Sequence, residues 1–311
     1  MYILKKILLI FTRYIYQKLH YFKYFKKSKF SDYFNYLWIL YIGSNHGRRH
    51  QLYVNKKDNQ NTLKEYEEIN KKISFNQSIK NKDIIIFLGD SHAEFYGRNY
   101  NSNFKTNKFF LSIWLGPVLL LNFCKSVYSI NRSIFFLDKI IKKFGKSNKY
   151  HIILTFGEID IRTSFYQFLK VYKTHENLEI LLNDIINSLN ETIFLIKKKL
   201  KYPNNLKFYF KEPTPTTNRE GYLTTNIEEV KKLIFSLQFP IMGKASDRVI
   251  WHKSLVEKLK RNNDNLTFLE ISKNNYNDKG AINQKFSDDH HITSAKLIQE
   301  FQNFLINNNV Q

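Results

Sequence analysis

The sequence predicts an α/β fold in which a doubly wound parallel sheet lies between helices. Two observations support this prediction. From residue 82 onward, short apolar runs alternate with longer amphipathic stretches, and most of the runs are apolar on both faces, as in strands buried between helical layers. The 311 residues are long for one domain and short for two. We therefore expect one α/β core, residues 81–311, preceded by an N-terminal extension, residues 1–80.

The core contains five predicted strands and four predicted helices. The short apolar runs that predict strands are residues 84–88, 109–113, 152–156, 206–210 and 267–271. The longer amphipathic segments that predict helices are residues 132–144, 178–201, 247–261 and 293–307. The second helix is the most regular, because its Leu and Ile residues recur at spacings of three and four and so share one helical face.

The extension begins with a basic aromatic segment, residues 1–31, which contains eight Lys or Arg residues and no acid. Its longest apolar run, residues 7–11, is far shorter than the roughly 20 residues that span a bilayer. No small-residue cleavage site follows it, so it does not resemble a signal peptide. We expect either a helix lying on an anionic membrane surface or a helical extension packed on the core, and a cytoplasmic or peripheral membrane location.

The composition limits the possible partners and sites. A net charge of +22 suggests a polyanionic partner, but the chain is rich in Lys and Asn throughout, which is typical of a compositional bias. No zinc-finger spacing or Gly-rich phosphate loop accompanies the charge, so no specific nucleic-acid site is predicted. The single cysteine, Cys124, excludes an internal disulfide and a multi-cysteine zinc site, and we expect it to be a small buried residue.

Two polar motifs carry the chemistry. The first predicted strand runs into Gly89-Asp90-Ser91-His92, which places a serine in a strand-to-helix turn. About 200 residues later, just before the last predicted helix, residues 288–291 read Asp-Asp-His-His. A serine hydroxyl becomes a good nucleophile when a histidine accepts its proton and a carboxylate orients that histidine. Ser91, His291 and Asp288 are the candidates for these three roles.

These motifs resemble those of the SGNH or GDSL-type hydrolases. The Gly-Asp-Ser-His motif at 89–92 matches the family's first block, and residues 288–291 match its Asp-x-x-His last block. Residues 157–162, Gly-Glu-Ile-Asp-Ile-Arg, stand where the family's Gly-x-Asn-Asp block belongs. The resemblance covers residues 82–311. It implies a flavodoxin-like three-layer α/β/α sandwich with a central five-stranded parallel sheet.

The resemblance also implies roles for single residues. Ser91 would be the nucleophile and donate its amide to the oxyanion, His291 would be the base, and Asp288 would orient the base. Gly116, near the position of the family's second block, would present another backbone donor, although Gly116 and the following proline are also typical of a plain turn. The implied reaction is ester hydrolysis or acyl transfer on carbohydrate or lipid.

One position departs from the family pattern. The asparagine that donates a side-chain hydrogen bond to the oxyanion is replaced by Ile159, and losing such a donor typically costs about 3 kcal/mol. The sequence resembles a divergent branch associated with polysaccharides. We expect Arg162, held by Glu158 and Asp160, to act as an electrostatic substitute. The alternative is that Arg162 forms a structural ion pair with one of these acids.

The expected function is therefore a serine esterase acting on an O-acylated, most simply O-acetylated, carbohydrate. Three alternatives remain: a glycan O-acyltransferase of the same fold, a catalytically weak glycan-binding module, and a protein that binds anionic lipid or nucleic acid through residues 1–31. His92 and His290 lie beside the proposed triad and leave the histidine assignment open. We expect no cofactor and no metal, because no two-histidine, one-carboxylate spacing occurs on one predicted helix.

Overall fold

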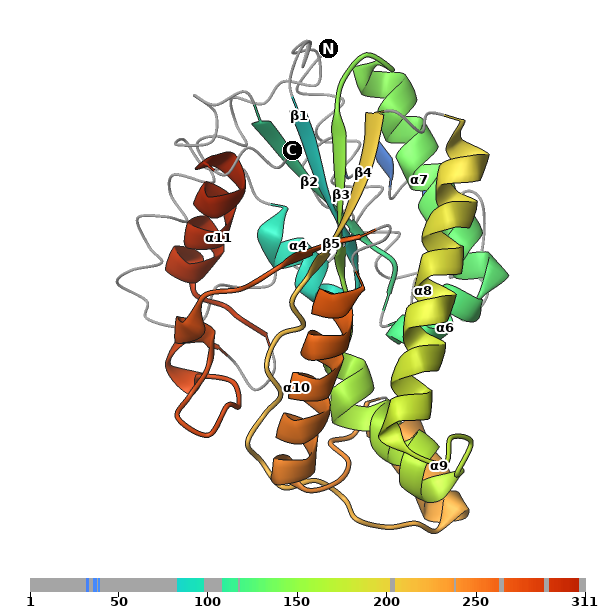
Figure 1. Cartoon of the computed structure of the whole chain (residues 1–311), viewed down its shortest axis with the longest axis vertical. Coiled ribbons are helices and arrows are strands. Elements are labelled where there is room, and N and C mark those ends of the chain that lie inside the picture. Colours follow the sequence, from blue (N-terminus) through green and yellow to red (C-terminus); the bar gives the residue numbers. More distant parts are fainter. Residues whose placement is uncertain are drawn as a thin grey trace.

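A five-stranded parallel sheet forms the centre of the computed structural model (Figure 1). The strands are β1 (Asp83–Gly89), β2 (Lys108–Trp114), β3 (Tyr150–Thr155), β4 (Leu206–Lys211) and β5 (Thr267–Leu269). Their order is β2-β1-β3-β4-β5, and every adjacent pair is parallel. This is the flavodoxin-like strand order. The predicted fold class is confirmed, and each predicted strand lies within two residues of the observed one.

The structure describes the core and a small part of the extension. The described residues are 32, 33, 36, 37, 39, 83–97, 108–116, 118–201, 205–237, 239–262, 266–287 and 291–307.

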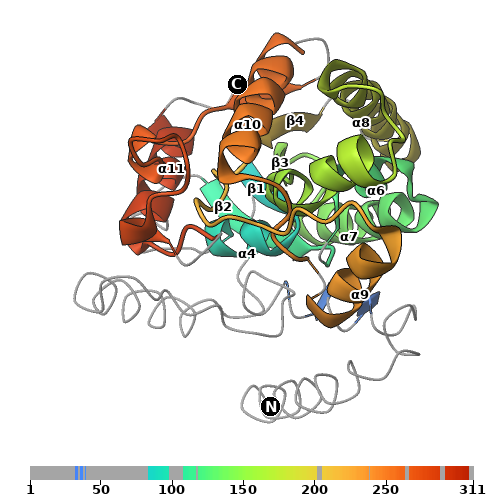
Figure 2. The ribbon, with the colours of Figure 1, turned by 90° about the horizontal axis from the view of Figure 1, so that it is seen from below.

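Helices cover both faces of the sheet and give the molecule three layers. Alternate side chains of β1 enter different cores, with Ile86 facing one and Phe87 facing the other. The first face packs against α6 (Leu120–Lys125), α7 (Val127–Phe144) and α8 (Leu178–Leu200). The second packs against α4 (Ser91–Tyr96) and α11 (Ala295–Asn307). The view from below shows the two groups on opposite sides of the sheet (Figure 2).

Two further helices flank this sandwich, and one predicted helix begins five residues earlier than expected. Helix α10 (Ala245–Arg261) packs on α8 and β5, and α9 (Ile227–Leu237) buries only Val230. The amphipathic pattern did not predict α6 and α9, because the first has six residues and the second is mostly exposed. The helix predicted from residue 132 begins at Val127, since the Ser126 side chain caps it by accepting a hydrogen bond from the Ser129 amide.

An unpredicted helical segment, residues 158–171, follows β3. It contains two π-helical stretches, Asp160–Ser164 and Gln167–Val171, which remove the 3.6-residue period that would reveal a helix in the sequence. The loop before α10 holds the first stretch in place. The Met242 amide donates to the Arg162 carbonyl at 2.9 Å, and the Thr163 hydroxyl donates to the Pro240 carbonyl at 2.9 Å.

The described residues of the extension are helical and pack against α7. Asp32 accepts a hydrogen bond from Arg132 Nε at 2.8 Å, the Tyr36 hydroxyl donates to the Lys139 carbonyl, and Ile39 is fully buried. Residues 1–31 lie outside the described part of the chain, so their predicted membrane contact stays a prediction. Among the residues that are described, no helix combines the length and the apolar character needed to cross a membrane.

Helix α8 offers a test of this packing. Leu189 is fully buried in the core, whereas Leu195 on the same helix is 39% exposed. We expect Leu189→Ala to lower the free energy of unfolding by about 2 to 5 kcal/mol, because it leaves a cavity. The matched Leu195→Ala should cost less than about 1 kcal/mol. Denaturant unfolding measures both, and equal losses would contradict the burial of this face.

Candidate active site

The candidate nucleophile lies where the strand order reverses. The chain connection from β1 leads outward to β2 on one side, and β3 lies on the other side of β1. Ligands of open α/β sheets bind outside the carboxyl ends of the strands at such a switch point. Ser91 is the first residue of α4, directly after the carboxyl end of β1. The topology therefore places Ser91 at the favoured ligand position of this fold.

Gly89 and Asp90 shape the turn that presents Ser91. A side chain at Gly89 would collide with the carbonyl oxygen and hydroxyl of Thr155 on β3, so only glycine fits this close approach of two strands. Asp90 caps α4, because its carboxylate accepts a hydrogen bond from the His92 amide at 2.9 Å. The turn is thus fixed on both sides of the serine.

The structure brings Ser91 and His291 together across 200 residues of sequence. The distance from Ser91 Oγ to His291 Nε2 is 2.8 Å. In the tautomer with an unprotonated Nε2, the serine hydroxyl donates to the imidazole, which is the arrangement needed to remove its proton. His291 is 7% exposed, and its ring lies 5.4 Å from that of Phe95. The imidazole of His291 is therefore largely shielded, whereas Ser91 remains partly accessible.

The loop that carries His291 is tied to the turn before it. The amides of Thr293 and Ser294 both donate to the Phe286 carbonyl, and Ser287 pairs with Ile292 in an isolated antiparallel β-bridge. Residues 288–290 lie outside the described part of the chain. The predicted orienting role of Asp288 and the placement of His290 therefore stay predictions.

Asp90 and His92 form an acid–histidine pair beside His291, which the sequence did not predict. Asp90 Oδ1 lies 2.8 Å from His92 Nδ1, and both residues are buried. The ring of His92 lies 4.8 Å from that of His291. The sequence signal for Asp90 is its type and position, since Asp is strongly preferred before the first residue of a helix. A charge on His92 would act directly on the imidazole next to Ser91.

The structure separates the two acids that were expected to hold Arg162. Glu158 Oε1 accepts from Arg162 Nε at 2.8 Å, and Glu158 is 1% exposed. Another guanidinium nitrogen, Nη1, donates to the Phe239 carbonyl at 2.8 Å. Asp160 instead accepts a hydrogen bond from the Leu120 amide at 2.7 Å. Glu158 and Arg162 therefore form a buried pair, while Asp160 secures the amino end of α6.

Burial changes the ionisation of Asp160. It raises the pKa of this carboxyl to about 7, helped by the negative charge of Asp90 and opposed by hydrogen bonds from the amides of Leu120 and Leu121. Its Oδ1 is buried and has no hydrogen-bond partner within the described residues. Near neutral pH the protonated and ionised forms of Asp160 are thus both populated.

Two other positions complete the surroundings of the turn. Gly116 has a φ of 104°, and a Cβ there would enter open space, with Val118 Cγ2 nearest at 3.9 Å. The preceding Leu115 amide donates to the Gly89 carbonyl at 2.8 Å, which ties the ends of β2 and β1 together. Ile159 is 3% exposed and presents only hydrocarbon, so its side chain cannot donate to an oxyanion.

A buried cation lies behind α4. Lys211, at the end of β4, is 1% exposed, and its Nζ lies 4.9 Å from the centre of the Tyr96 ring. Burial lowers the pKa of Lys211 to about 8, opposed by the charges of Glu212 and Asp90. In its ammonium form Lys211 offsets part of the negative charge on Asp90. Within the described residues, no three His, Cys, Asp or Glu side chains cluster as metal ligands would.

Comparisons with solved structures find nine matching chains, among them two distant likenesses from Streptococcus pneumonia and Bacteroides fragilis. A protein of Streptococcus pneumonia, provisionally assigned as a platelet activating factor, is 17% identical with a TM-score of 0.41, over 80% of this chain and 95% of that one. A Bacteroides fragilis protein, provisionally assigned as an acylhydrolase, is 12% identical with a TM-score of 0.37, over 75% of this chain and 90% of that one. No family model and no curated protein matches the chain.

The pKa of Asp160 leads to a test by stability. Because this pKa is higher in the folded chain than in the unfolded chain, ionisation favours unfolding. The contribution of the protonated Asp160 carboxyl to the free energy of unfolding is therefore complete below about pH 4 and is lost as the pH rises through about 7. At about 1.4 kcal/mol per pKa unit, the wild type should lose on the order of 4 kcal/mol in free energy of unfolding between pH 4 and 8 because Asp160 ionises. Asp160→Asn should not show this loss.

Guanidinium unfolding of the wild type and the variant at both pH values measures this difference. Asn keeps the size of the side chain and an acceptor for the Leu120 amide. Asp138→Asn, at a carboxylate whose side chain is 30% exposed, serves as the control variant. An identical pH dependence in the wild type and Asp160→Asn would contradict a carboxyl that ionises at a cost inside the fold.

Proposed function

We propose that this chain is a serine ester hydrolase that removes acyl groups, most simply acetyl groups, from carbohydrate. The observation that carries the proposal is the 2.8 Å distance between Ser91 Oγ and His291 Nε2 at the switch point of the sheet. A serine hydroxyl and an imidazole at hydrogen-bond distance form the core of a nucleophilic acyl-transfer site. The carbohydrate part of the proposal rests on the sequence resemblance alone.

The reaction would proceed through an acyl-enzyme. Ser91 Oγ attacks the ester carbonyl while His291 Nε2 takes its proton, and the resulting imidazolium protonates the departing sugar oxygen. Water then attacks the acyl-serine and gives its proton to His291, which returns that proton to Ser91 Oγ as the carboxylic acid leaves. Asp288 is the proposed partner that holds the imidazole in the required tautomer. If a sugar hydroxyl replaces water in the second step, the same site acts as an O-acyltransferase.

The oxyanion needs donors other than the side chain at position 159. The proposed donors are the amides of Ser91 and Gly116. We assign Arg162 a supporting electrostatic role, because its Nε and Nη1 groups already donate to Glu158 and the Phe239 carbonyl. A site that lacks one side-chain donor is expected to be slower by a factor of about 100 to 1,000. The buried Ile159 therefore also favours a second candidate function, a catalytically weak module that binds glycan.

Covalent labelling separates these two functions. A fluorophosphonate probe should label the wild type at Ser91, because the probe needs an activated serine. We expect Ser91→Ala to abolish labelling and His291→Ala to slow it by at least a hundredfold. Ser287→Ala, which removes a hydroxyl from the same loop region, should label like the wild type. Mass mapping of the adduct identifies the site, and a folded wild type that stays unlabelled would favour the binding module.

Arg162→Lys tests the role of the guanidinium. Lysine keeps the charge but cannot bridge Glu158 and the Phe239 carbonyl with two separate nitrogens. If Arg162 stabilises the oxyanion, the variant should lose at least tenfold in the labelling rate and in hydrolysis of p-nitrophenyl acetate. Unchanged rates, together with a lower free energy of unfolding, would assign the Glu158–Arg162 pair a purely structural role.

A further inference from the structure

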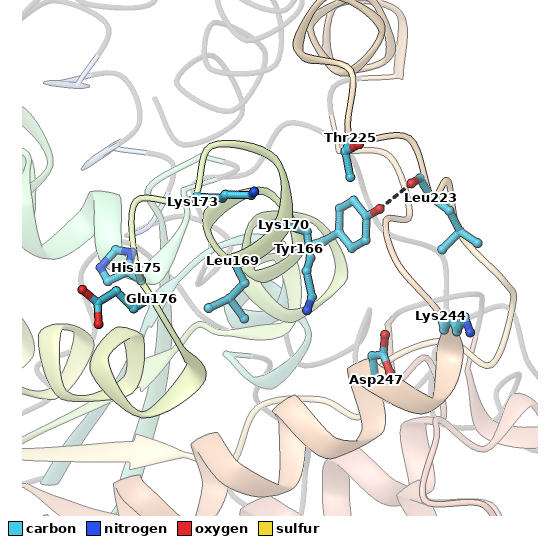
Figure 3. A pocket seen from close by; sticks show the side chains of 10 residues that line it. All are labelled: Tyr166, Leu169, Lys170, Lys173, His175, Glu176, Leu223, Thr225, Lys244 and Asp247. Atoms are coloured by element: carbon cyan, nitrogen blue, oxygen red, sulfur yellow. Dashed lines mark hydrogen bonds between the residues drawn. The ribbon is translucent and has the colours of Figure 1, made fainter.

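A hollow of about 640 Å³ lies beyond the candidate active site, against the end of the helical segment 158–171. The second π-helical stretch and the turn after it form one wall, and residues 222–225 and the start of α10 form the other (Figure 3). Its volume is within the range of small-molecule and sugar sites. Nothing in the catalytic proposal uses it.

The walls of this hollow carry three lysines: Lys170 and Lys173 on one side and Lys244 on the other. All three are exposed, and no described carboxylate lies within ion-pair distance of their ammonium groups. Lys173 adopts a left-handed backbone with a φ of 49°, which is uncommon for a residue other than glycine. Three unpaired cations around one hollow attract an anionic group.

The remaining lining differs from a simple anion site. Asp247 and Glu176 add two carboxylates, and the Tyr166 hydroxyl donates to the Leu223 carbonyl, which fixes the aromatic ring in the wall. Asp247 lies close enough to Tyr166 to help raise the pKa of that phenol, although burial contributes more. Carboxylates accept hydrogen bonds from sugar hydroxyls. Cations and carboxylates together suit a sugar that itself carries an acidic group.

The helical segment connects this hollow to the candidate active site. It begins at Glu158, directly beyond β3, and Lys170 lies ten residues after Asp160. The segment lies at the carboxyl end of the sheet, the same end as Ser91 (Figure 1). The hollow and Ser91 are therefore both associated with the carboxyl end of the sheet, the hollow through the last turns of this segment.

We propose that this hollow is a subsite for acidic sugar residues, so that the substrate is an anionic oligosaccharide or polysaccharide. Lys170, Lys173 and Lys244 bind the sugar carboxylates, while Asp247 accepts hydrogen bonds from hydroxyl groups. The location of the subsite relative to Ser91 rests on the proposed function, whereas binding in the hollow does not. Acylated acidic sugars held here would place a neighbouring acyl ester at the serine.

Calorimetric titration of the full chain tests the binding. The probes are an oligogalacturonate and a neutral dextran oligosaccharide of equal length. We expect the wild type to bind the acidic probe at least tenfold more tightly than the neutral one, with affinity falling as salt rises. Combined replacement of Lys170, Lys173 and Lys244 by Gln should weaken binding of the acidic probe at least tenfold.

The control variant removes the same charge elsewhere. Lys149, Lys207 and Lys279 are also exposed and lie outside the hollow. Their combined replacement by Gln should change the affinity less than twofold. Equal weakening in both triple variants would overturn the subsite, because it would indicate only the overall positive charge of the chain. Equal binding of the acidic and neutral probes would overturn its specificity.

Asp247→Asn distinguishes an acidic sugar from a bare anion. If the hollow binds the sugar hydroxyls through this carboxylate, the variant should bind oligogalacturonate at least threefold more weakly. If the hollow is only an anion site, removing a negative charge should instead tighten binding of both inorganic phosphate and oligogalacturonate, and the sugar assignment is overturned.

Fluorophosphonate labelling of the same variants separates the two proposals. The Lys170, Lys173 and Lys244 replacements should leave labelling of Ser91 at the wild-type rate. Wild-type protein that binds oligogalacturonate in the predicted way but is not labelled would retain the subsite and reject the esterase. Labelling without selective binding of the acidic probe would retain the esterase and reject the subsite.

Discussion

The close approach of β1 and β3 is the constraint on which the rest of the site depends. Gly89 lies against Thr155 with no room for a side chain, and the two strands are parallel and in register up to this point. Their carboxyl ends therefore open side by side. The turn after β1 presents Asp90 and Ser91, and the segment after β3 presents the buried Glu158 and Asp160. The two segments lie side by side at the carboxyl end of the sheet, because Gly89 allows β1 to lie close to Thr155 of β3.

The polar groups under the candidate site are buried but mostly paired. Asp90 is bonded to His92, Glu158 to Arg162, and Asp160 to the amide of Leu120. Removing one partner from such a group would leave an uncompensated charge, which costs far more than an exposed ion pair contributes. The Asp160 bond also connects separate elements, since it ties the π-helical stretch after β3 to the amino end of α6. The other two pairs are local and fix the side chains within the turn after β1 and within the helical segment after β3.

The π-helical segment joins this chemistry to the hollow beyond it. Its first stretch contains Asp160 and Arg162, and its second contributes Lys170 to the hollow. Its backbone is held from outside by the loop before α10, through the bond between Met242 and Arg162 and that between Thr163 and Pro240. Since π-helical turns cost stability relative to regular helix, they often mark functional segments. The proposed acidic-sugar subsite gives this segment a role beyond packing.

The sequence by itself determined the fold class, the strands and the regular helix α8, because the burial of apolar side chains imposes a period that can be read locally. It also singled out Ser91 and His291 by residue type and spacing. Helix α9 and the π-helical segment escaped prediction, since the first buries a single residue and the second lacks the regular period. The pairing of Asp90 with His92, the separation of Asp160 from Arg162 and the lysine-lined hollow were decided only by the tertiary structure. The Asp90–His92 pair is local, but it depends on how the side chains point in the turn after β1. The bond from Leu120 to Asp160 and the lysine-lined hollow depend on elements far apart in the chain, which are brought together by the strand order.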